Sequence, residues 1–319
     1  MKNILNDNKN KQSMRNIYGE TISAFGEKRE DIVVLDADLS CSTKTSIFAK
    51  KHPGRFFNVG IAEQNLITQA CGLSLTGKKV YVSSFAMFAT GRAWEQIRNT
   101  LCYNDLDVKI VATHCGLTVG EDGASHQALE DIAIMKAIPN MMIYSPCDAN
   151  ETKKILEFSL SYNKPMYIRL SRCDVYDVFN EENNFNPYKA STLMSGNDAT
   201  IISTGEFTYN AIKAAKVLKE ENDLNIEVMH IGMIKPIDKE SIIKIAKKQK
   251  PIFTLENHSI IGGVGSSVCD VVCSSNYPCR VIKFGVNDTF GQSGKPDELL
   301  EYYNLTPNQI ANEIKKYLV

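Results

Sequence analysis

Short runs rich in β-branched residues alternate with amphipathic segments along the chain, and this alternation limits the fold more than any other feature. In the first half, five runs are typical of buried strands: 31–38, 78–84, 108–114, 141–145 and 166–171. Between the second and third runs, Trp94, Ile97 and Leu101 fall on one helical face. Strands that alternate with helices predict an α/β fold, with a mainly parallel sheet flanked by helices.

A polar stretch divides the chain. From about Tyr176 to Asn197 the sequence is dominated by Asn, Glu and Pro without a hydrophobic period, which is typical of a linker. The alternation then resumes, with expected strands at 199–204, 226–231, 252–256 and 280–284, and expected helices at 206–221, 239–249, after Gly262, and at 307–318 behind a Thr-Pro helix start. We therefore predict two α/β domains, at 1–177 and 198–319, joined by a linker at 178–197.

The charge balance argues against two classes of partner. Lys and Arg number 36 against 37 Asp and Glu, so the formal net charge is −1. Nucleic acid and anionic membranes are bound by basic patches, and neither is expected as a partner. No apolar run approaches the length of a membrane span, and the N-terminus shows no apolar signal segment. The nine cysteines include no CxxC pair, so we expect reduced thiols and a cytoplasmic location.

Two segments place candidate functional residues where predicted strands end. Glu63 follows the extended run FFNVGI and opens a helix, at the sheet edge where parallel sheets form ligand clefts. The alternative is a first-turn glutamate that stabilises the helix dipole. Phe85 and Phe88 follow the strand at 78–84 and are three apart, so they could line a flat pocket for a heterocycle or belong to the core.

A glycine-rich loop after the third predicted strand gathers several polar groups. It carries His114, Asp122 and His126, which resemble a general acid–base cluster. A zinc site is the rival, although the spacing of twelve between the histidines matches no short metal motif. Cys115 is a candidate thiolate, but neighbours on a strand point to opposite faces. We expect no nucleophile pair from Ser125 and His126, because adjacent side chains seldom align for proton transfer.

Taken together, these segments resemble, in order and spacing, the pyrimidine-binding domain of the transketolase family. GIAEQN, SSFAMFATGRAWEQIRN and HCGLTVGEDGASHQALEDIA match the family's catalytic-glutamate, aromatic and histidine-rich motifs. The resemblance continues through PNMMIYSPCDANET, YIRLSR, LENHSIIGGVGSSV and GVNDTFGQSG. It implies that 1–177 is the pyrimidine-binding domain and 198–319 the transketolase C-terminal domain. GGVG at 262–265 has no following lysine, so we expect a glycine-rich helix start rather than a phosphate loop.

The resemblance implies thiamine diphosphate as cofactor and the transfer of a two-carbon ketol unit from a ketose phosphate to an aldose phosphate. Glu63 would hydrogen-bond a ring nitrogen from an apolar pocket that favours the protonated carboxyl group. Phe85 and Phe88 would stack on the ring, and Asp38 matches a family aspartate near the cofactor, although a loop cap explains it equally well. The substrate-side polar residues are matched by His114, Asp122 and His126. The set that holds the sugar phosphate is matched by Arg15, Ser42, Arg172 and His114.

Half of such a cofactor site is missing from the sequence. The family binds the metal of the diphosphate with a Gly-Asp-Gly segment followed by asparagines, which does not occur here. The resemblance therefore implies the C-terminal subunit of a split transketolase of the pentose phosphate pathway. The Mg²⁺ or Ca²⁺ ligands would lie on a separate N-terminal subunit, and self-association would give a two-plus-two heterotetramer.

Three alternatives stay open. The β-subunit of a 2-oxo-acid dehydrogenase has the same layout, but GEDGASH with His114 follows the sugar-handling branch. Deoxyxylulose-phosphate synthase shares IAEQ but normally carries all three domains in one chain. A non-catalytic paralogue is the third, and the presence of Glu63, both phenylalanines and both histidines argues against it. The sugars, and whether their anionic end is phosphate, do not follow from the sequence.

Overall fold

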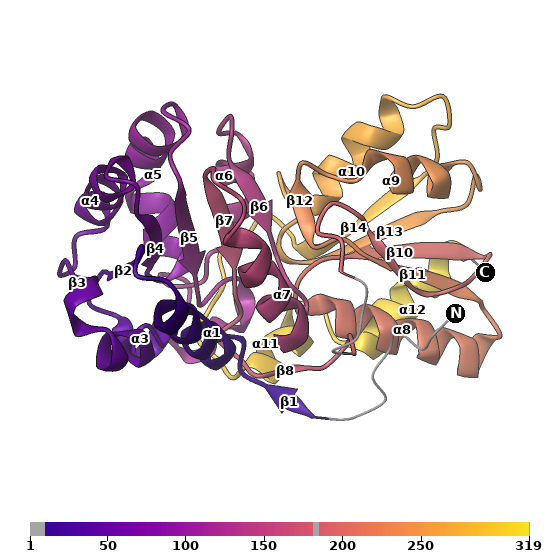
Figure 1. Cartoon of the computed structure of the whole chain (residues 1–319). Coiled ribbons are helices and arrows are strands. Elements are labelled where there is room, and N and C mark those ends of the chain that lie inside the picture. Colours follow the sequence, from indigo (N-terminus) through magenta and orange to yellow (C-terminus); the bar gives the residue numbers. More distant parts are fainter. Residues whose placement is uncertain (1–9, 181–184, 319) are drawn as a thin grey trace.

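The computed structural model describes residues 10–180 and 185–318. Within them the chain forms two α/β units that lie side by side, the first coloured indigo to magenta and the second orange to yellow (Figure 1). Each unit has one main sheet with helices packed against it, so the predicted α/β class with two mainly parallel sheets is confirmed. In this described part of the chain, no helix has the length and apolar character needed to cross a membrane.

The first sheet has seven strands, and all but one run parallel. In sheet order they are β12 (Met233–Lys235), β6 (Met142–Tyr144), β7 (Met166–Arg169), β5 (Val108–Ala112), β4 (Lys79–Ser83), β2 (Ile32–Asp36) and β3 (Phe56–Asn58). Each of the five strands predicted for the first half of the chain forms within its expected range. Strand β12 is the antiparallel one and comes from the second half of the chain.

Two helical layers cover this sheet. One contains α1 (Met14–Lys28), α3 (Ser46–Lys51) and α7 (Ala149–Ser159), and the other contains α4 (Glu63–Leu75) and α6 (Asp131–Lys136). Strand β2 shows why both layers form. Val33 and Leu35 pack with α4, whereas Ile32 and Val34 pack with α1. Successive side chains point to opposite faces, and a sheet buried on both faces therefore reads as a continuous apolar run.

The helix predicted from the apolar face at 93–101 takes an unexpected form. Met87–Arg92 (η2) and Ile97–Cys102 (η3) are π-helical, and only Trp94–Gln96 (α5) between them is α-helical. The apolar face still packs into the core as predicted. π-Helices are rare in proteins, and those that occur are often found at functional sites. Over so short a segment, the spacing of hydrophobic residues cannot distinguish a π-helix from an α-helix.

The second sheet has five strands, of which one is antiparallel. In sheet order they are β14 (Val281–Val286), β13 (Ile252–Ser259), β10 (Ala199–Ser203), β11 (Ile226–His230) and β9 (Ser191–Met194). The helices of this unit are α8 (Phe207–Asn222), α9 (Lys239–Ala246), α10 (Val264–Cys273), α11 (Pro296–Tyr302) and α12 (Pro307–Leu318). The Thr306 hydroxyl accepts from the Gln309 N–H at 3.4 Å, and Gln309 accepts from the Thr306 N–H at 3.3 Å. This reciprocal pair forms a capping box at the predicted Thr-Pro helix start.

The boundary between the units is more structured than the predicted linker at 178–197. Val178 and Phe179 are buried, and β9 pairs with β11 inside the predicted linker. The short strand was missed because it has two polar residues followed by two apolar ones, without alternation, and only Leu193 is buried. Residues 181–184 lie outside the described residues. Just before this range, β8 (Val175–Tyr176) pairs antiparallel with β1 (Lys11–Gln12).

A buried arginine, which is ion-paired within the first unit, also bonds the second unit. The Arg169 side chain, at the end of β7, donates from Nε to Asp131 Oδ2 at 2.7 Å. Its Nη2 reaches the Asn257 carbonyl oxygen of β13 in the second unit at 2.7 Å. The Tyr167 hydroxyl also donates to Asp131 Oδ2, at 2.6 Å. Arg169 thus forms hydrogen bonds in both units. The junction is fixed by these directional hydrogen bonds and by strand β12, which joins the first sheet from the second half of the chain.

Candidate active site

The predicted site residues gather at the carboxyl ends of the parallel strands of the first sheet. Asp38 follows β2, Glu63 follows β3, Phe85 follows β4, His114 follows β5 and Arg172 follows β7. Ligand sites of parallel sheets form at this edge, because the loops there converge. The sequence pattern predicted this placement, and the structure decides how the side chains meet.

Glu63 is the first residue of α4, and its side chain is only 1% exposed. Its Oε2 accepts a hydrogen bond from Arg92 Nη1 at 2.7 Å. The helix start alone would allow a surface glutamate that stabilises the dipole, whereas burial with an ion-pair partner assigns this carboxyl group to a site. The sequence reasoning missed Arg92, although it stands inside the aromatic motif, four residues after Phe88.

Arg92 ends the π-helix η2, and its side chain is 48% exposed. Its guanidinium carbon lies 4.9 Å from the centre of the Phe88 ring, within the range of a cation–π contact. The same side chain therefore covers an aromatic face and bonds Glu63. A single helical turn places both contacts side by side.

Phe85 and Phe88 form an aromatic wall together with the two predicted histidines. The two phenylalanine rings stack with centroids 6.2 Å apart, and the His114 ring stacks on Phe85 at 3.7 Å. The His126 ring meets Phe88 edge-on at 5.2 Å. Residues from two motifs that are separated in sequence thus share one surface. This arrangement favours a binding role for the two phenylalanines over a purely structural role in the hydrophobic core.

His114 is buried and has the left-handed φ of +58°, which is uncommon for a residue with a side chain. Its Nδ1 lies 2.8 Å from the Thr113 hydroxyl oxygen. Burial lowers the pKa of His114 to about 3, and the charges of Arg15, Arg172 and His126 lower it further in the same direction. The imidazole is therefore neutral near pH 7, and it can donate one hydrogen bond from one ring nitrogen while it accepts one at the other.

The loop that carries the remaining polar residues is a kinked 3₁₀-helix, Leu117–Asp122 (η4). Asp122 is exposed at its end, and His126 is half-buried. The Ser125 hydroxyl lies 3.0 Å from His126 Nδ1, so the expectation that these neighbours would not align is wrong. The Gly123 carbonyl oxygen accepts from the backbone N–H groups of His126 at 2.9 Å and Gln127 at 3.1 Å, and this tight turn brings the two side chains together. Burial raises the pKa of the Cys115 thiol, which argues against a thiolate nucleophile.

The residues predicted to hold an anion converge next to His114. Arg15 Nη1 donates to the carbonyl oxygen of Ser42 at 2.9 Å, so the backbone of Ser42 makes this contact. Arg15 Nε is buried without a hydrogen-bond partner in the described part of the chain. Burial lowers the pKa of Arg15, and the charge of Arg172 lowers it further. Arg172 also bonds Glu121 at 3.3 Å on the outer side.

Asp38 has a left-handed φ of +64° and is exposed. Asn58, at the end of β3, donates from Nδ2 to Asp38 Oδ1 at 2.9 Å and accepts from the Asp38 N–H at 3.0 Å. The loop-capping role falls instead to buried Asp36, which accepts from Leu39 N–H at 2.6 Å and from the Thr43 hydroxyl at 2.7 Å. Asp38 instead connects the loop after β2 to the end of β3 through Asn58.

The glycine-rich segment 262–265 is a helix start, as expected. Glu256 accepts from the Val264 N–H at 2.7 Å and the Gly265 N–H at 2.8 Å, so an internal carboxylate occupies the N-terminus of α10. A Cβ atom on Gly263 would lie 1.9 Å from Glu256 Oε2, which explains the glycine there.

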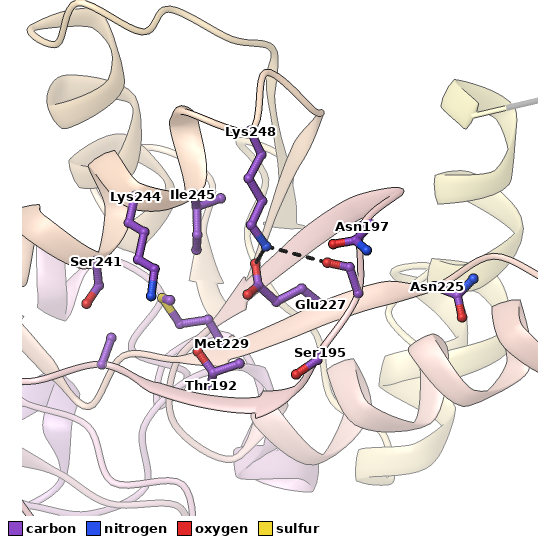
Figure 2. Close-up of a pocket in the computed structure, with 12 residues that line it drawn as sticks. Thr192, Ser195, Asn197, Asn225, Glu227, Met229, Ser241, Lys244, Ile245 and Lys248 are labelled. Carbon is purple, nitrogen blue, oxygen red and sulfur yellow. Dashed lines mark hydrogen bonds and ion pairs between the residues drawn. The ribbon is translucent and has the colours of Figure 1, made fainter. Parts of the chain in front are cut away.

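Two hollows elsewhere do not compete for the same role. One, of about 530 Å³, lies between β9, β11 and α9, and its Lys248 bonds Glu227 at 2.9 Å (Figure 2). It holds none of the predicted residues. The other, of about 1030 Å³, lies beside η4 and between the units. Its charged lining is mainly acidic: Glu121, Asp174, Glu206, Asp297, Glu298 and Glu301, against Lys11 and Lys295. An anionic sugar would be repelled there.

One buried group of possible metal ligands, Cys147, Glu151 and His230, occurs among the described residues. Glu151 already accepts from the Tyr144 hydroxyl at 2.6 Å and the Cys147 N–H at 2.6 Å, and it pairs with His230 at 2.9 Å. Burial raises the pKa of the Cys147 thiol, so its thiolate is disfavoured. We therefore interpret the group as a hydrogen-bonded connection between the units.

The arrangement fits one part of thiamine diphosphate. A buried carboxyl group beside flat aromatic faces can bind a planar heterocycle with ring nitrogens, as its aminopyrimidine is. Glu63, Phe85 and Phe88 supply these elements. Arg15 and Arg172 carry positive charges that are not needed for binding this ring.

Comparisons with known proteins agree with this geometry. Residues 10–176 match the family described as the pyrimidine binding domain of transketolase, and residues 188–310 match the transketolase C-terminal domain. The chain therefore belongs to the transketolase family. Within that family it matches the C-terminal section of transketolases that are divided between two polypeptides.

Three relatives carry this second statement. A Methanocaldococcus jannaschii protein named as a transketolase C-terminal section is 51% identical, over 95% of this chain and 95% of that protein. The structure of a split-gene transketolase, described as an inactive β4 tetramer, is 46% identical with a TM-score of 0.88, over 96% of this chain and 98% of that one. A 6-deoxy-6-sulfo-D-fructose transketolase subunit from Clostridium sp. is 35% identical, over 93% of this chain and 92% of that protein.

Proposed function

We propose that this chain is the C-terminal subunit of a two-chain transketolase that transfers a two-carbon ketol unit from a ketose phosphate to an aldose phosphate. The observation that carries the proposal is the buried Glu63 carboxyl group beside the wall of Phe85 and Phe88, at the carboxyl edge of a parallel sheet. Thiamine diphosphate, when bound, supplies the nucleophilic carbon that takes up the transferred unit. The chain's own residues bind, orient and exchange protons around it.

Glu63 would share a proton with a ring nitrogen of the aminopyrimidine. Burial of the carboxyl group makes this hydrogen bond strong, because water does not compete for it. Phe85 and Phe88 would bind the ring face and exclude water. Asp38, which stands at the same edge, would face the cofactor.

His114, His126 and Asp122 would hold the hydroxyl groups of the sugar. His114 is neutral and buried, so it can orient a hydroxyl group without introducing a second charge beside the arginines. His126 and Asp122 lie nearer to solvent, where proton exchange is possible. These roles follow from the placement of the three side chains around the aromatic wall and the loop η4.

Arg15, Arg172 and the backbone of Ser42 would bind the anionic end of the sugar. Arg15 Nε is buried without a hydrogen-bond partner among the described residues, which supports an anion at this position, and the charge of Arg172 would help to attract it. The sulfonated sugar in the name of the Clostridium relative indicates that related proteins act on more than one kind of anion. Phosphate is our first choice and sulfonate is the alternative to test.

The diphosphate and its Mg²⁺ or Ca²⁺ would be held by a separate N-terminal subunit. We propose a two-plus-two heterotetramer, in which two copies of this chain associate with two of the partner. The split-gene transketolase described as an inactive β4 tetramer supports self-association of the corresponding section in that protein.

The decisive experiment is co-expression with the adjacent-gene partner. Ketol transfer from xylulose 5-phosphate to ribose 5-phosphate is then measured for the pair, with each chain alone as control. We expect activity only for the pair. Activity of this chain alone would contradict the split site. Turnover of pyruvate with glyceraldehyde 3-phosphate instead would identify a deoxyxylulose-phosphate-synthase-like enzyme, and decarboxylation of a 2-oxo acid alone would identify the dehydrogenase alternative.

A further inference from the structure

Arg92 makes two contacts in the structure, and both are contacts that the aminopyrimidine ring would need. Its Nη1 bonds the buried Glu63 carboxyl group at 2.7 Å, and its guanidinium covers the face of Phe88 at 4.9 Å. A guanidinium is planar and carries N–H donors, so it resembles a small flat heterocycle in shape and hydrogen bonding. The ring and Arg92 would therefore meet the same carboxyl group and the same aromatic face.

The charge of Arg92 also opposes the state that the ring requires. A buried carboxylate is costly unless it is paired, and the arginine provides the pairing charge. A carboxyl group that shares a proton with a weakly basic ring nitrogen must take up that proton, and a neighbouring cation disfavours this uptake. The ring is thus bound best when Arg92 has moved away from Glu63.

The position of Arg92 allows such a movement. Its side chain is half-exposed, whereas that of Glu63 is almost completely buried. The arginine can therefore turn into solvent, or toward an anionic group, without leaving a buried charge of its own. Glu63 cannot follow it, because the carboxyl group is enclosed at the start of α4.

We propose that Arg92 is a positioning residue that competes with the aminopyrimidine ring for Glu63 and Phe88, and that it gives way when the ring binds. This inference rests on the proposed function, since it presupposes that Glu63 receives the ring. It assigns a role to Arg92, the last residue of the π-helix η2. Arg92 stands four residues after Phe88 in this helix, so the two side chains share one face of it.

The test measures thiamine diphosphate binding to the assembled two-chain protein by calorimetry, for Arg92→Gln, Arg92→Lys and the control Arg98→Gln. Arg98 is an exposed arginine nearby that bonds Asn99, and within the described part of the chain it forms no hydrogen bond or ring contact with Glu63 or Phe88. We expect Arg92→Gln to bind about three- to tenfold more tightly, where tenfold corresponds to about 1.4 kcal/mol. Arg92→Lys keeps the charge and should stay near the wild type, and Arg98→Gln should be unchanged.

A double-mutant cycle separates competition from a structural effect. In a Glu63→Gln background the gain from Arg92→Gln should disappear, because the pair no longer exists. In this chain alone, Arg92→Gln should lower the melting temperature, and the added Glu63→Gln should restore it. Weaker or unchanged binding by Arg92→Gln would overturn the competition and leave the proposed function standing. No binding by the wild-type pair would overturn the proposed function and the competition with it.

Discussion

The substitution Arg169→Met tests how the two units are held together. Arg169 is 3% exposed and bonds Asp131 at 2.7 Å and the Asn257 carbonyl oxygen at 2.7 Å. Methionine keeps an unbranched apolar side chain but removes the charge and its donors, which leaves Asp131 buried with the Tyr167 hydroxyl as its remaining side-chain hydrogen bond. Breaking a buried pair by removing one partner costs about 3–5 kcal/mol. We expect the free energy of unfolding to fall by about that amount.

Urea unfolding of this chain alone, followed by the fluorescence of its single tryptophan, Trp94, measures the effect. The matched control is Arg29→Met, whose partner Asp31 is a similar carboxylate but whose side chains are 38% and 35% exposed. An exposed pair contributes at most about 1 kcal/mol. Adding Asp131→Asn to Arg169→Met removes the unpaired charge and should recover part of the loss. A loss of less than about 1 kcal/mol for Arg169→Met, which is no more than an exposed ion pair contributes, would refute the reasoning.

The pH dependence of the same experiment has a defined sign. Burial raises the pKa of Asp131, but Arg169 and His258 outweigh burial and hold that pKa below its ordinary value. A carboxyl group with a depressed folded-state pKa stabilises the protein above its unfolded pKa and loses this contribution as the pH falls through the folded value. The difference in the free energy of unfolding between the wild type and Arg169→Met should therefore be largest near neutral pH and should shrink in acid below about pH 4.

Three further predictions concern the proposed site. Glu63→Gln should reduce ketol transfer by about a hundredfold or more while leaving the melting temperature within a few degrees, as enzyme assay and calorimetry would show. Arg15→Gln should raise the KM for a phosphorylated donor by about ten- to a hundredfold and leave that for an unphosphorylated ketose unchanged, since a charged hydrogen bond contributes about 1.5–3 kcal/mol. Burial lowers the pKa of His114 to about 3, so an NMR titration should show its imidazole neutral from about pH 5 upward; protonation near pH 6.5 would contradict the buried placement.

The sequence alone predicted most of the strands and helices and the position of several candidate site residues along them. Strands such as β2 and β4 were predicted because a sheet buried on both faces needs continuous apolar runs, and the start of α12 because its cap is local. Local rules also placed Glu63 at a helix start and Phe85 after a strand. These predictions depend on neighbours within a few residues, and the sequence shows such neighbours directly.

Only the tertiary structure decided what these residues touch. β12 joins the first sheet from the other half of the chain, because its partner β6 is adjacent only after folding. Arg15 reaches the Ser42 carbonyl oxygen and Arg92 reaches the Glu63 carboxyl group through long-range packing. Such contacts join residues far apart in sequence, and their geometry depends on the packing of whole layers, which no local pattern encodes.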